Sequence, residues 1–384
     1  MGNKYKCTIV GCGDMGAVNM NRKFPYIYSH IGAIISDPQT ELIAVADADK
    51  TRAEYAGTKL GVKSYINWRQ MIEKVNPDIV FCSAGPEVNP DVIRTAFNRK
   101  IKGVYCEKPL SLSLATADEL AELEEKNPQT SVQVGYLRNS DIAHNNIARF
   151  VKEGGLGNLQ GVRIIYNGGA FSILPHATAY LEQVLDGAKS VSGRLSPRGS
   201  LNDLDPNIDG DITYNFSLQG RNITTQVLAT ERGKKANNLY LFEMEFMGDE
   251  KILTIAQNGW GFLLREISPS HIFWDAVGTK HAYPVAFASV RGGKIVKELS
   301  HNPKAIPKEL YGDKAGEMVA NGLENLLFSM ATAVPTNCTI DRARRAEEVA
   351  HALNISATSR NKGRIIKLPL HGEDRKHSFG KNHV

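Results

Sequence analysis

The sequence predicts an α/β protein made of two parts. The first is an N-terminal Rossmann domain with a doubly wound parallel sheet, and the second is a C-terminal α+β domain with a large open, mostly antiparallel sheet. Two observations support this fold class. The 384 residues suffice for about two domains. Strand-like and helix-like patterns alternate from the N-terminus to Gly135, whereas strand-like runs with short glycine-containing turns dominate the second half.

Five short runs in the first part have strand-like patterns, and the near-continuous apolar character of Glu41–Asp47 is typical of a strand covered on both faces. These runs are Lys4–Val10, Glu41–Asp47, Asp78–Ser83, Gly103–Cys106 and Ser131–Gly135. Helices are expected between them, because residues that commonly cap helices precede helical patterns. Asp49 caps a helix that stops at Gly61, Asn67 caps 68–75, a further helix starts near Pro90, and Ser113 caps 114–126.

The second part begins with a helix at 142–153 that ends in two glycines. The clearest strands that follow are 160–166, 210–218, 222–230, 240–247 and 251–256, and then come helices 315–332 and 341–357 and a strand at 364–368. The last residues are polar. We therefore expect a domain of residues 1–135, a second domain of residues 136–370 and a polar tail of residues 371–384.

Composition excludes several protein classes. The chain is 42% hydrophobic and 23% charged, as in a soluble globular protein. Its net charge, 46 − 41 = +5, is spread along the sequence, which argues against a nucleic acid partner.

We expect no membrane partner, because no apolar run approaches the roughly 18 residues of a membrane span. The start shows no signal-peptide pattern, and five cysteines without a C-x-x-C pair indicate reduced thiols and a cytoplasmic protein. No metal-ligand spacing is found.

A glycine motif follows the first predicted strand. Gly11-Cys12-Gly13-Asp14-Met15-Gly16 has the G-x-G-x-x-G pattern, in which glycines allow a tight turn and a close approach of the backbone to a pyrophosphate. An acidic residue is expected about 20 residues later, at the end of the second strand. Asp47 has that place, but it follows Gly16 by about ten residues more than the usual spacing.

The excess length has two interpretations. Pro25 can occupy a first helical position, and Pro25 to Asp47 spans about 22 residues, the usual length from helix start to acidic residue. In this interpretation an expansion of about ten residues, within Ala17–Phe24, separates the glycines from the first helix. The alternative is one kinked helix that runs from Met15 onward.

Asp47 favours NAD as the cofactor, since a carboxylate there accepts hydrogen bonds from the adenosine ribose hydroxyls and repels a 2′-phosphate. Lys50 and Arg52 are close in sequence and keep NADP as an alternative.

Cys106-Glu107-Lys108-Pro109 follows the fifth strand, at the sheet edge where doubly wound folds bind ligands. Together with the glycine motif and the V-A-D at Asp47, this E-K-P resembles the glucose–fructose oxidoreductase / inositol dehydrogenase / rhizopine-catabolism (Gfo/Idh/MocA) family. Further elements of the resemblance are Gly135-Tyr136-Leu137-Arg138, Gly154-Gly155-Leu156-Gly157, Gly168-Gly169, and His176 with Gly187 eleven residues later.

The resemblance implies hydride transfer between nicotinamide and a secondary alcohol of a sugar, sugar derivative or cyclitol. Such a reaction needs a base for the hydroxyl proton. By resemblance, Lys108 lies beside the nicotinamide and the reacting hydroxyl, and His176 is the general acid/base. Ser172 stands where the family usually has Asp, four residues before that His. An alternative register makes Tyr180 the catalytic residue.

The remaining site residues also follow from the resemblance. Ser83, Ala84 and Gly85 are expected near the nicotinamide ribose, and Glu107 beside the cofactor. Tyr136, Arg138 and Asn139 are expected to contact the substrate. The family's second domain often forms an oligomer contact, so a homodimer or homotetramer is expected. Two other functions stay open, namely a dinucleotide- or sugar-sensing regulator without catalysis, and a glycoside-cleaving or epimerising enzyme that holds NAD tightly.

Overall fold

The structure is a computed structural model. It describes residues 4–17, 29–167, 173–193, 210–230, 242–256, 261–267, 285–291, 294–300, 318–357 and 364–375. The chain divides into two compact units. The first consists of Met1–Asp141, Glu317–Glu347 and Arg375–Gly380, and the second of Ile142–Gly316, Glu348–Asp374 and Lys381–Val384. The sequence-based division at residues 135 and 370 stays a prediction about independently folding domains.

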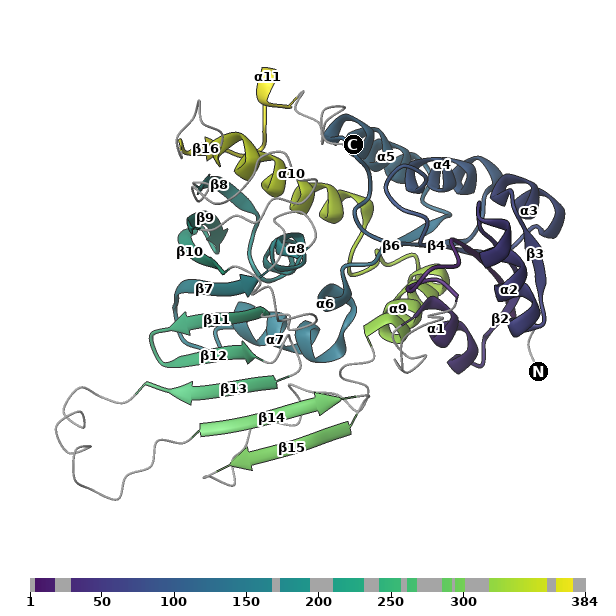
Figure 1. Cartoon of the computed structure of the whole chain (residues 1–384). Helices are drawn as coiled ribbons and strands as arrows, with labels where there is room; N and C mark the ends of the chain where they lie inside the picture. Colours follow the sequence, from purple (N-terminus) through teal and green to yellow (C-terminus); the bar gives the residue numbers. More distant parts are fainter. Residues whose placement is uncertain are drawn as a thin grey trace. The chain divides into compact units, whose positions relative to one another are not determined.

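The first unit contains a six-stranded parallel sheet with the strand order β3-β2-β1-β4-β5-β6 (Figure 1). Its strands are β1 (Tyr5–Val10), β2 (Thr40–Ala46), β3 (Lys63–Tyr65), β4 (Ile79–Cys82), β5 (Gly103–Cys106) and β6 (Ser131–Val134). This is the Rossmann order, in which the direction of winding reverses between β1 and β4. The predicted doubly wound sheet is confirmed, and β3 is a short additional strand.

Four helices of the first unit start where the sequence predicts them, namely α2 (Lys50–Leu60), α3 (Trp68–Val75), α4 (Asn89–Arg99) and α5 (Leu114–Lys126). The unit also contains α1 (His30–Ser36) and the short helix α6 (Leu137–Ser140), whose starts at these residues the sequence did not predict. The side chains of Asp49, Asn67 and Ser113 accept hydrogen bonds from backbone N–H groups in the first turns of α2, α3 and α5. Gly61 ends α2 with a φ of 68°, the left-handed conformation that favours glycine.

A helix from near the end of the sequence completes the core of this unit. Helix α9 (Met318–Thr332) contributes Val319, Leu323 and Leu326 to the hydrophobic cluster that also contains Ile9 of β1. Gly322 lets α9 approach the sheet closely, because a Cβ there would lie 2.4 Å from the Tyr105 hydroxyl. The Rossmann sheet is therefore covered in part by α9. In the sequence this helix comes after every strand of the second unit except β16.

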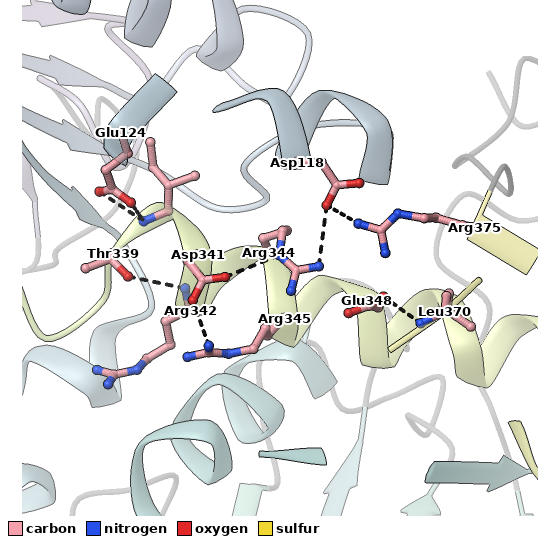
Figure 2. Close-up of polar contacts among 11 residues, drawn as sticks. Asp118, Glu124, Thr339, Asp341, Arg342, Arg344, Arg345, Glu348, Leu370 and Arg375 are labelled. Atoms are coloured by element: carbon pink, nitrogen blue, oxygen red, sulfur yellow. Dashed lines mark hydrogen bonds and ion pairs between the residues drawn. The ribbon is translucent and has the colours of Figure 1, made fainter. Parts of the chain in front are cut away.

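Helix α10 (Ile340–Ala357) passes from the first unit to the second between Glu347 and Glu348. Its first turn is held by Glu124 of α5, whose carboxylate accepts a 3.0 Å hydrogen bond from the Ile340 N–H (Figure 2). Asp118 of α5 pairs with Arg344 on α10 and with Arg375 of the short helix α11 (Gly372–Arg375). These contacts fix the beginning of α10 against α5.

The second unit contains a ten-stranded sheet, in the order β15-β14-β13-β12-β11-β7-β10-β9-β8-β16. Its strands are β7 (Leu159–Asn167), β8 (Ala188–Gly193), β9 (Gly210–Leu218), β10 (Arg221–Thr230), β11 (Phe242–Gly248), β12 (Lys251–Ala256), β13 (Gly261–Glu266), β14 (Val285–Arg291), β15 (Lys294–Ser300) and β16 (Ile366–Lys367). The pairing is antiparallel except between β7 and β10, which run parallel. The large, mostly antiparallel sheet is confirmed, and β8 and β13 to β15 extend it beyond the predicted strands.

Two helices of the second unit bear on the site, α7 (Ile142–Lys152) and α8 (Leu174–Val184). Both carry buried apolar side chains, among them Ile147 and Leu181. The described part of the chain contains no helix of the length and apolar character that crossing a bilayer requires.

Candidate active site

The predicted cofactor residues of the first unit follow neighbouring parallel strands. Gly11 comes after β1, Asp47 after β2, Ser83 after β4 and Glu107 after β5. The carboxyl ends of parallel strands meet at one edge of a sheet, and the order reverses here between β1 and β4. This edge is where an open α/β sheet binds its ligand.

The glycine turn, residues 11–16, packs closely against the end of β4. Gly11 has a φ of +92°, and a Cβ at Gly16 would lie 1.9 Å from the Gly11 carbonyl oxygen. The Ser83 hydroxyl donates a 2.8 Å hydrogen bond to that oxygen. Around Gly13, in contrast, a Cβ would meet nothing within 4 Å. Gly11 and Gly16 are thus needed for the turn itself, while the space at Gly13 fits a pyrophosphate that approaches the backbone closely.

The backbone shows how the extra length before Asp47 is accommodated. The His30 N–H donates to the Met15 carbonyl at 2.8 Å, and the Ile31 N–H donates to that of Gly16 at 3.0 Å. Such bonds join residues four apart in a helix, whereas here they join residues fifteen apart, so about eleven residues are additional. Without these additional residues, Asp47 would follow Gly16 by about 20 residues, which is the usual spacing.

These bonds support an insertion between the glycines and α1. A single helix would separate residues fifteen apart by about 22 Å, which disagrees with the hydrogen bond between Met15 and His30. The described helix begins at His30, after the N-cap residue Ser29. Residues 18–28, and with them the predicted helix start at Pro25 and most of Ala17–Phe24, lie outside the described residues.

Asp47 connects the glycine turn to the end of β2. Its Oδ2 accepts a 2.8 Å hydrogen bond from the Cys12 N–H, and its Oδ1 accepts one of the same length from the Asp49 N–H. The Arg52 guanidinium, 54% exposed, lies 3.1 Å from Oδ1. Lys50 pairs with Glu54. The acidic residue of the fingerprint is thus tied to the turn and paired with an exposed cation.

The other residues of the glycine turn differ in exposure. Asp14 is exposed and Met15 is half-buried. The Cys12 side chain is 3% exposed, and burial raises the pKa of its thiol to about 12. This thiol is therefore protonated at neutral pH.

The lysine turn, residues 107–111, follows β5 and is held by a buried asparagine. The Asn89 side chain is fully buried, and its Nδ2 donates to the carbonyls of Glu107 at 2.8 Å and Pro109 at 2.9 Å. Lys108, half-buried, lies between these two anchored carbonyls. The sequence pattern did not indicate that Asn89 holds this turn, because Asn89-Pro90 predicted only the start of a helix.

The Glu107 carboxylate lies inside the first unit. Its Oε1 is 3.2 Å from Nε2 of His30, a fully buried residue at the start of α1, although the two groups lack the alignment of a hydrogen bond. A Cβ at Gly135 would come within 2.9 Å of the same oxygen. The His30 ring packs edge-on against Tyr105, with 4.7 Å between ring centroids. His30 and Gly135 thus enclose the acidic side chain of the E-K-P motif.

The predicted substrate contacts of the first unit differ in exposure. Tyr136 is 1% exposed, and its hydroxyl donates a 3.2 Å hydrogen bond to Oε1 of Glu347. Asn139 is fully buried, whereas Arg138 is half-buried. After β4, Ser83 is half-buried, Ala84 is exposed, and Gly85 has a φ of +104°.

The two acid/base candidates lie on α8 of the second unit. His176 is half-buried in the first turn, and its N–H donates to the Ile173 carbonyl at 3.1 Å. Tyr180 is fully buried, and its hydroxyl donates to the His144 carbonyl at 2.8 Å. Gly168, Gly169 and Ser172 lie outside the described residues. No three His, Cys, Asp or Glu side chains among the described residues are grouped so that they could hold a metal ion.

Part of the chain is similar in sequence to known proteins. Residues 5–136 match the profile of the Gfo/Idh/MocA family, described as an oxidoreductase family with an NAD-binding Rossmann fold. The chain is 29% identical over 154 residues to an inositol 2-dehydrogenase of Salmonella typhimurium, a match that covers 40% of this chain and 43% of the relative. A myo-inositol 2-dehydrogenase of Thermotoga maritima is 32% identical over 124 residues, 32% of this chain and 36% of that protein. The chain thus spans less than half the length of these relatives.

Solved structures resemble the whole fold. An oxidoreductase from Sinorhizobium meliloti aligns with a TM-score of 0.71 and 16% identity, covering 95% of this chain and 100% of that one. An inositol dehydrogenase homologue from Azotobacter vinelandii, complexed with NADH and myo-inositol, aligns with a TM-score of 0.70 and 17% identity, covering 95% and 98%. The glycine turn, Asp47 and the lysine turn all fall within the matched segment. Residues 5–136 of this chain, which contain the predicted cofactor residues, are therefore similar to the NAD-binding Rossmann domain of the Gfo/Idh/MocA oxidoreductase family.

Proposed function

We propose that the protein is an NAD-dependent dehydrogenase that oxidises a secondary alcohol of a cyclitol, sugar or sugar derivative. The observation that carries the proposal is the lysine turn, in which Asn89 anchors the carbonyls on both sides of Lys108 at the ligand-binding edge of an NAD-binding domain. Rigid backbone on both sides restricts where the ammonium group can lie, and alcohol oxidation depends on such positioning. The inositol dehydrogenases among the relatives support a polyol substrate.

The proposal gives each residue a role. The backbone of the glycine turn would bind the pyrophosphate, and Asp47 would bind the adenosine ribose hydroxyls. NAD, when bound, supplies the hydride acceptor. Lys108 would orient the substrate oxygen and stabilise negative charge on it, while His176 would take up the hydroxyl proton. The burial of Tyr180 and its hydrogen bond to His144 support His176 over Tyr180. Arg138, half-buried, is the better placed of the predicted substrate contacts.

The experiment is a panel of inositols, other polyols, aldoses and sugar phosphates with NAD or NADP, followed by the absorbance of the reduced cofactor. We expect turnover with at least one polyol and a preference for NAD. Lys108→Met should lower kcat by about 100-fold or more while NADH binding persists. The matched control is Lys126→Met, which alters a 70% exposed lysine on α5 and should keep the kinetics of the wild type.

Undiminished turnover in Lys108→Met would refute the proposed role of that lysine. NAD that copurifies without exchanging, together with the absence of net cofactor reduction, would instead indicate an enzyme that recycles its own NAD. Cofactor and sugar binding without turnover by any route would indicate a sensor. The predicted homodimer or homotetramer is checked by light scattering of the same preparation.

A further inference from the structure

Glu347, on α10, reaches the lysine turn from the far end of the sequence. Its Oε1 accepts a 2.6 Å hydrogen bond from the N–H of Leu110, two residues after Lys108. The same oxygen accepts the hydrogen bond from the Tyr136 hydroxyl, and the Ser111 N–H also donates to this carboxylate. One side chain thus joins the turn after β5 to the residues that follow β6.

The surroundings of Glu347 make this contact hard to replace. The side chain is 3% exposed, Leu110 is fully buried and Tyr136 is 1% exposed. Water cannot readily take the place of a buried acceptor, so the turn and the carboxylate depend on each other. Asn89 anchors the turn through the carbonyls on both sides of Lys108, whereas Glu347 anchors it through N–H groups that follow Lys108.

We propose that Glu347 is a positioning residue, which fixes the lysine turn against Tyr136 and thereby sets the place and the electrostatic surroundings of Lys108. This inference rests on the role of Lys108 in the proposed function. It adds to that function a residue of α10 that lies 237 positions from its partner Leu110.

The pKa of the Glu347 carboxyl also affects the charge beside the lysine turn. Burial raises the pKa of this carboxyl to about 7, against the lowering effects of the Leu110 N–H, the Tyr136 hydroxyl, the Ser111 N–H and the Lys108 charge. Among the described residues, Cys106 of β5, Tyr136 and Cys338 are titratable groups that interact electrostatically with Glu347. Burial raises the pKa of each of these three groups, which keeps them neutral near pH 7. The charge beside Lys108 therefore changes around neutral pH through Glu347.

The chain offers a matched control in the next residue. Glu348 is also 3% exposed, and its Oε1 accepts a 2.8 Å hydrogen bond from the Leu370 N–H (Figure 2). Both glutamates thus hold the N–H of a leucine that follows a proline, but Glu348 and Leu370 belong to the second unit, whereas the lysine turn belongs to the first. Glu347→Gln and Glu348→Gln remove the same charge from equally buried positions.

The first measurement does not require a substrate. Lysines are methylated reductively with ¹³C-formaldehyde, and the Lys108 resonance is assigned by its absence in Lys108→Arg. We expect this resonance to shift with a midpoint near pH 7 in the wild type and in Glu348→Gln, and to lose that step in Glu347→Gln. A step that persists in Glu347→Gln would overturn the proposal, whether or not the protein oxidises any polyol.

The second measurement uses catalysis. With the best polyol, Glu347→Gln should lower kcat about tenfold, change KM less than threefold, and remove the inflection near neutral pH from the kcat profile. Glu348→Gln should keep the wild-type profile. An unchanged profile in Glu347→Gln would contradict the proposal.

A third variant covers the case in which Glu347→Gln does not fold. Tyr136→Phe removes one donor to the carboxylate and leaves the Leu110 contact in place. Because that donor lowers the pKa of Glu347, its loss should move the midpoint of the Lys108 shift to higher pH. An unmoved midpoint would count against the coupling of Tyr136, Glu347 and Lys108.

Discussion

The glycine turn after β1 and the lysine turn after β5 lie at the same edge of one sheet but are stabilised differently. The glycine turn is fixed by close backbone packing, with Gly16 against Gly11 and Ser83. The lysine turn is fixed by hydrogen bonds of the buried side chains Asn89 and Glu347, and the buried His30 ring lies beside its Glu107 carboxylate. The first depends on the absence of side chains, and the second depends on side chains brought in from elsewhere in the chain. Substitutions should therefore affect the two turns in different ways.

The largest effect is expected for Gly16→Ala. Its Cβ would lie 1.9 Å from the Gly11 carbonyl oxygen and 2.5 Å from the Ser83 hydroxyl, so the turn must open. We expect a loss of about 4 kcal/mol in the free energy of unfolding, measured by urea titration, and loss of NADH binding.

Gly13→Ala separates packing from binding within the same motif. A Cβ there meets nothing within 4 Å, so stability should stay within about 0.5 kcal/mol of the wild type. NADH binding, measured by fluorescence titration, should weaken at least tenfold, because the added methyl occupies the space proposed for the pyrophosphate. Equal destabilisation by both alanines would show that this division of the glycines is wrong.

His30→Ala tests the buried polar support of the lysine turn. The substitution leaves a cavity beside Phe81 and Tyr105 and removes the imidazole that faces the Glu107 carboxylate. We expect a loss of about 3 kcal/mol in urea unfolding. In a double-mutant cycle with Glu107→Gln, a coupling energy above about 0.5 kcal/mol is expected, and strict additivity would mean that the two side chains do not interact.

The buried carboxyls should also give the protein a pH dependence of stability. Burial raises the pKa of both Glu347 and Glu124 to about 7 from the ordinary value of 4.5. Between these two values the folded protein binds the proton more tightly than the unfolded chain does. The stabilisation is therefore fully present below pH 4.5 and is lost as the pH rises to about 7.

Glu347→Gln should accordingly reduce the fall in stability between about pH 5 and about pH 8 by about 2 kcal/mol, measured by urea unfolding at each pH. Gly13→Ala should keep the wild-type pH dependence, since it changes no ionisable group. A full wild-type pH dependence in Glu347→Gln would contradict the assignment of this titration to the lysine turn.

The difference between the glycine turn and the lysine turn also explains which features could be predicted from the sequence. The strands of the first unit except β3, the caps Asp49, Asn67 and Ser113, and the glycine turn follow from residues close together in the chain, and the structure confirms their places. Two features of the fold could not be predicted from local sequence patterns. Helix α9 joins the core of the first unit, and polar strands such as β8 enlarge the second sheet.

The supporting residues of the lysine turn could not be predicted in this way. Asn89 lies 18 residues before the Glu107 carbonyl that it binds, and Glu347 lies 237 residues after Leu110. No periodicity or spacing connects residues that meet only after the chain has folded. Tyr136 and Asn139 were predicted as substrate contacts, but a sequence pattern does not indicate whether such a side chain points into the core, where both are buried.

The passage of α10 from one unit to the other has a consequence for synthesis on the ribosome. The strands of the Rossmann sheet emerge first, whereas α9 and Glu347 emerge only after most of the second unit has been made. Until then the nascent sheet lacks part of its apolar cover, and the amide of Leu110 lacks its acceptor. The sheet can collapse early from local contacts, but the lysine turn reaches its final form only when nearly the whole chain has been made.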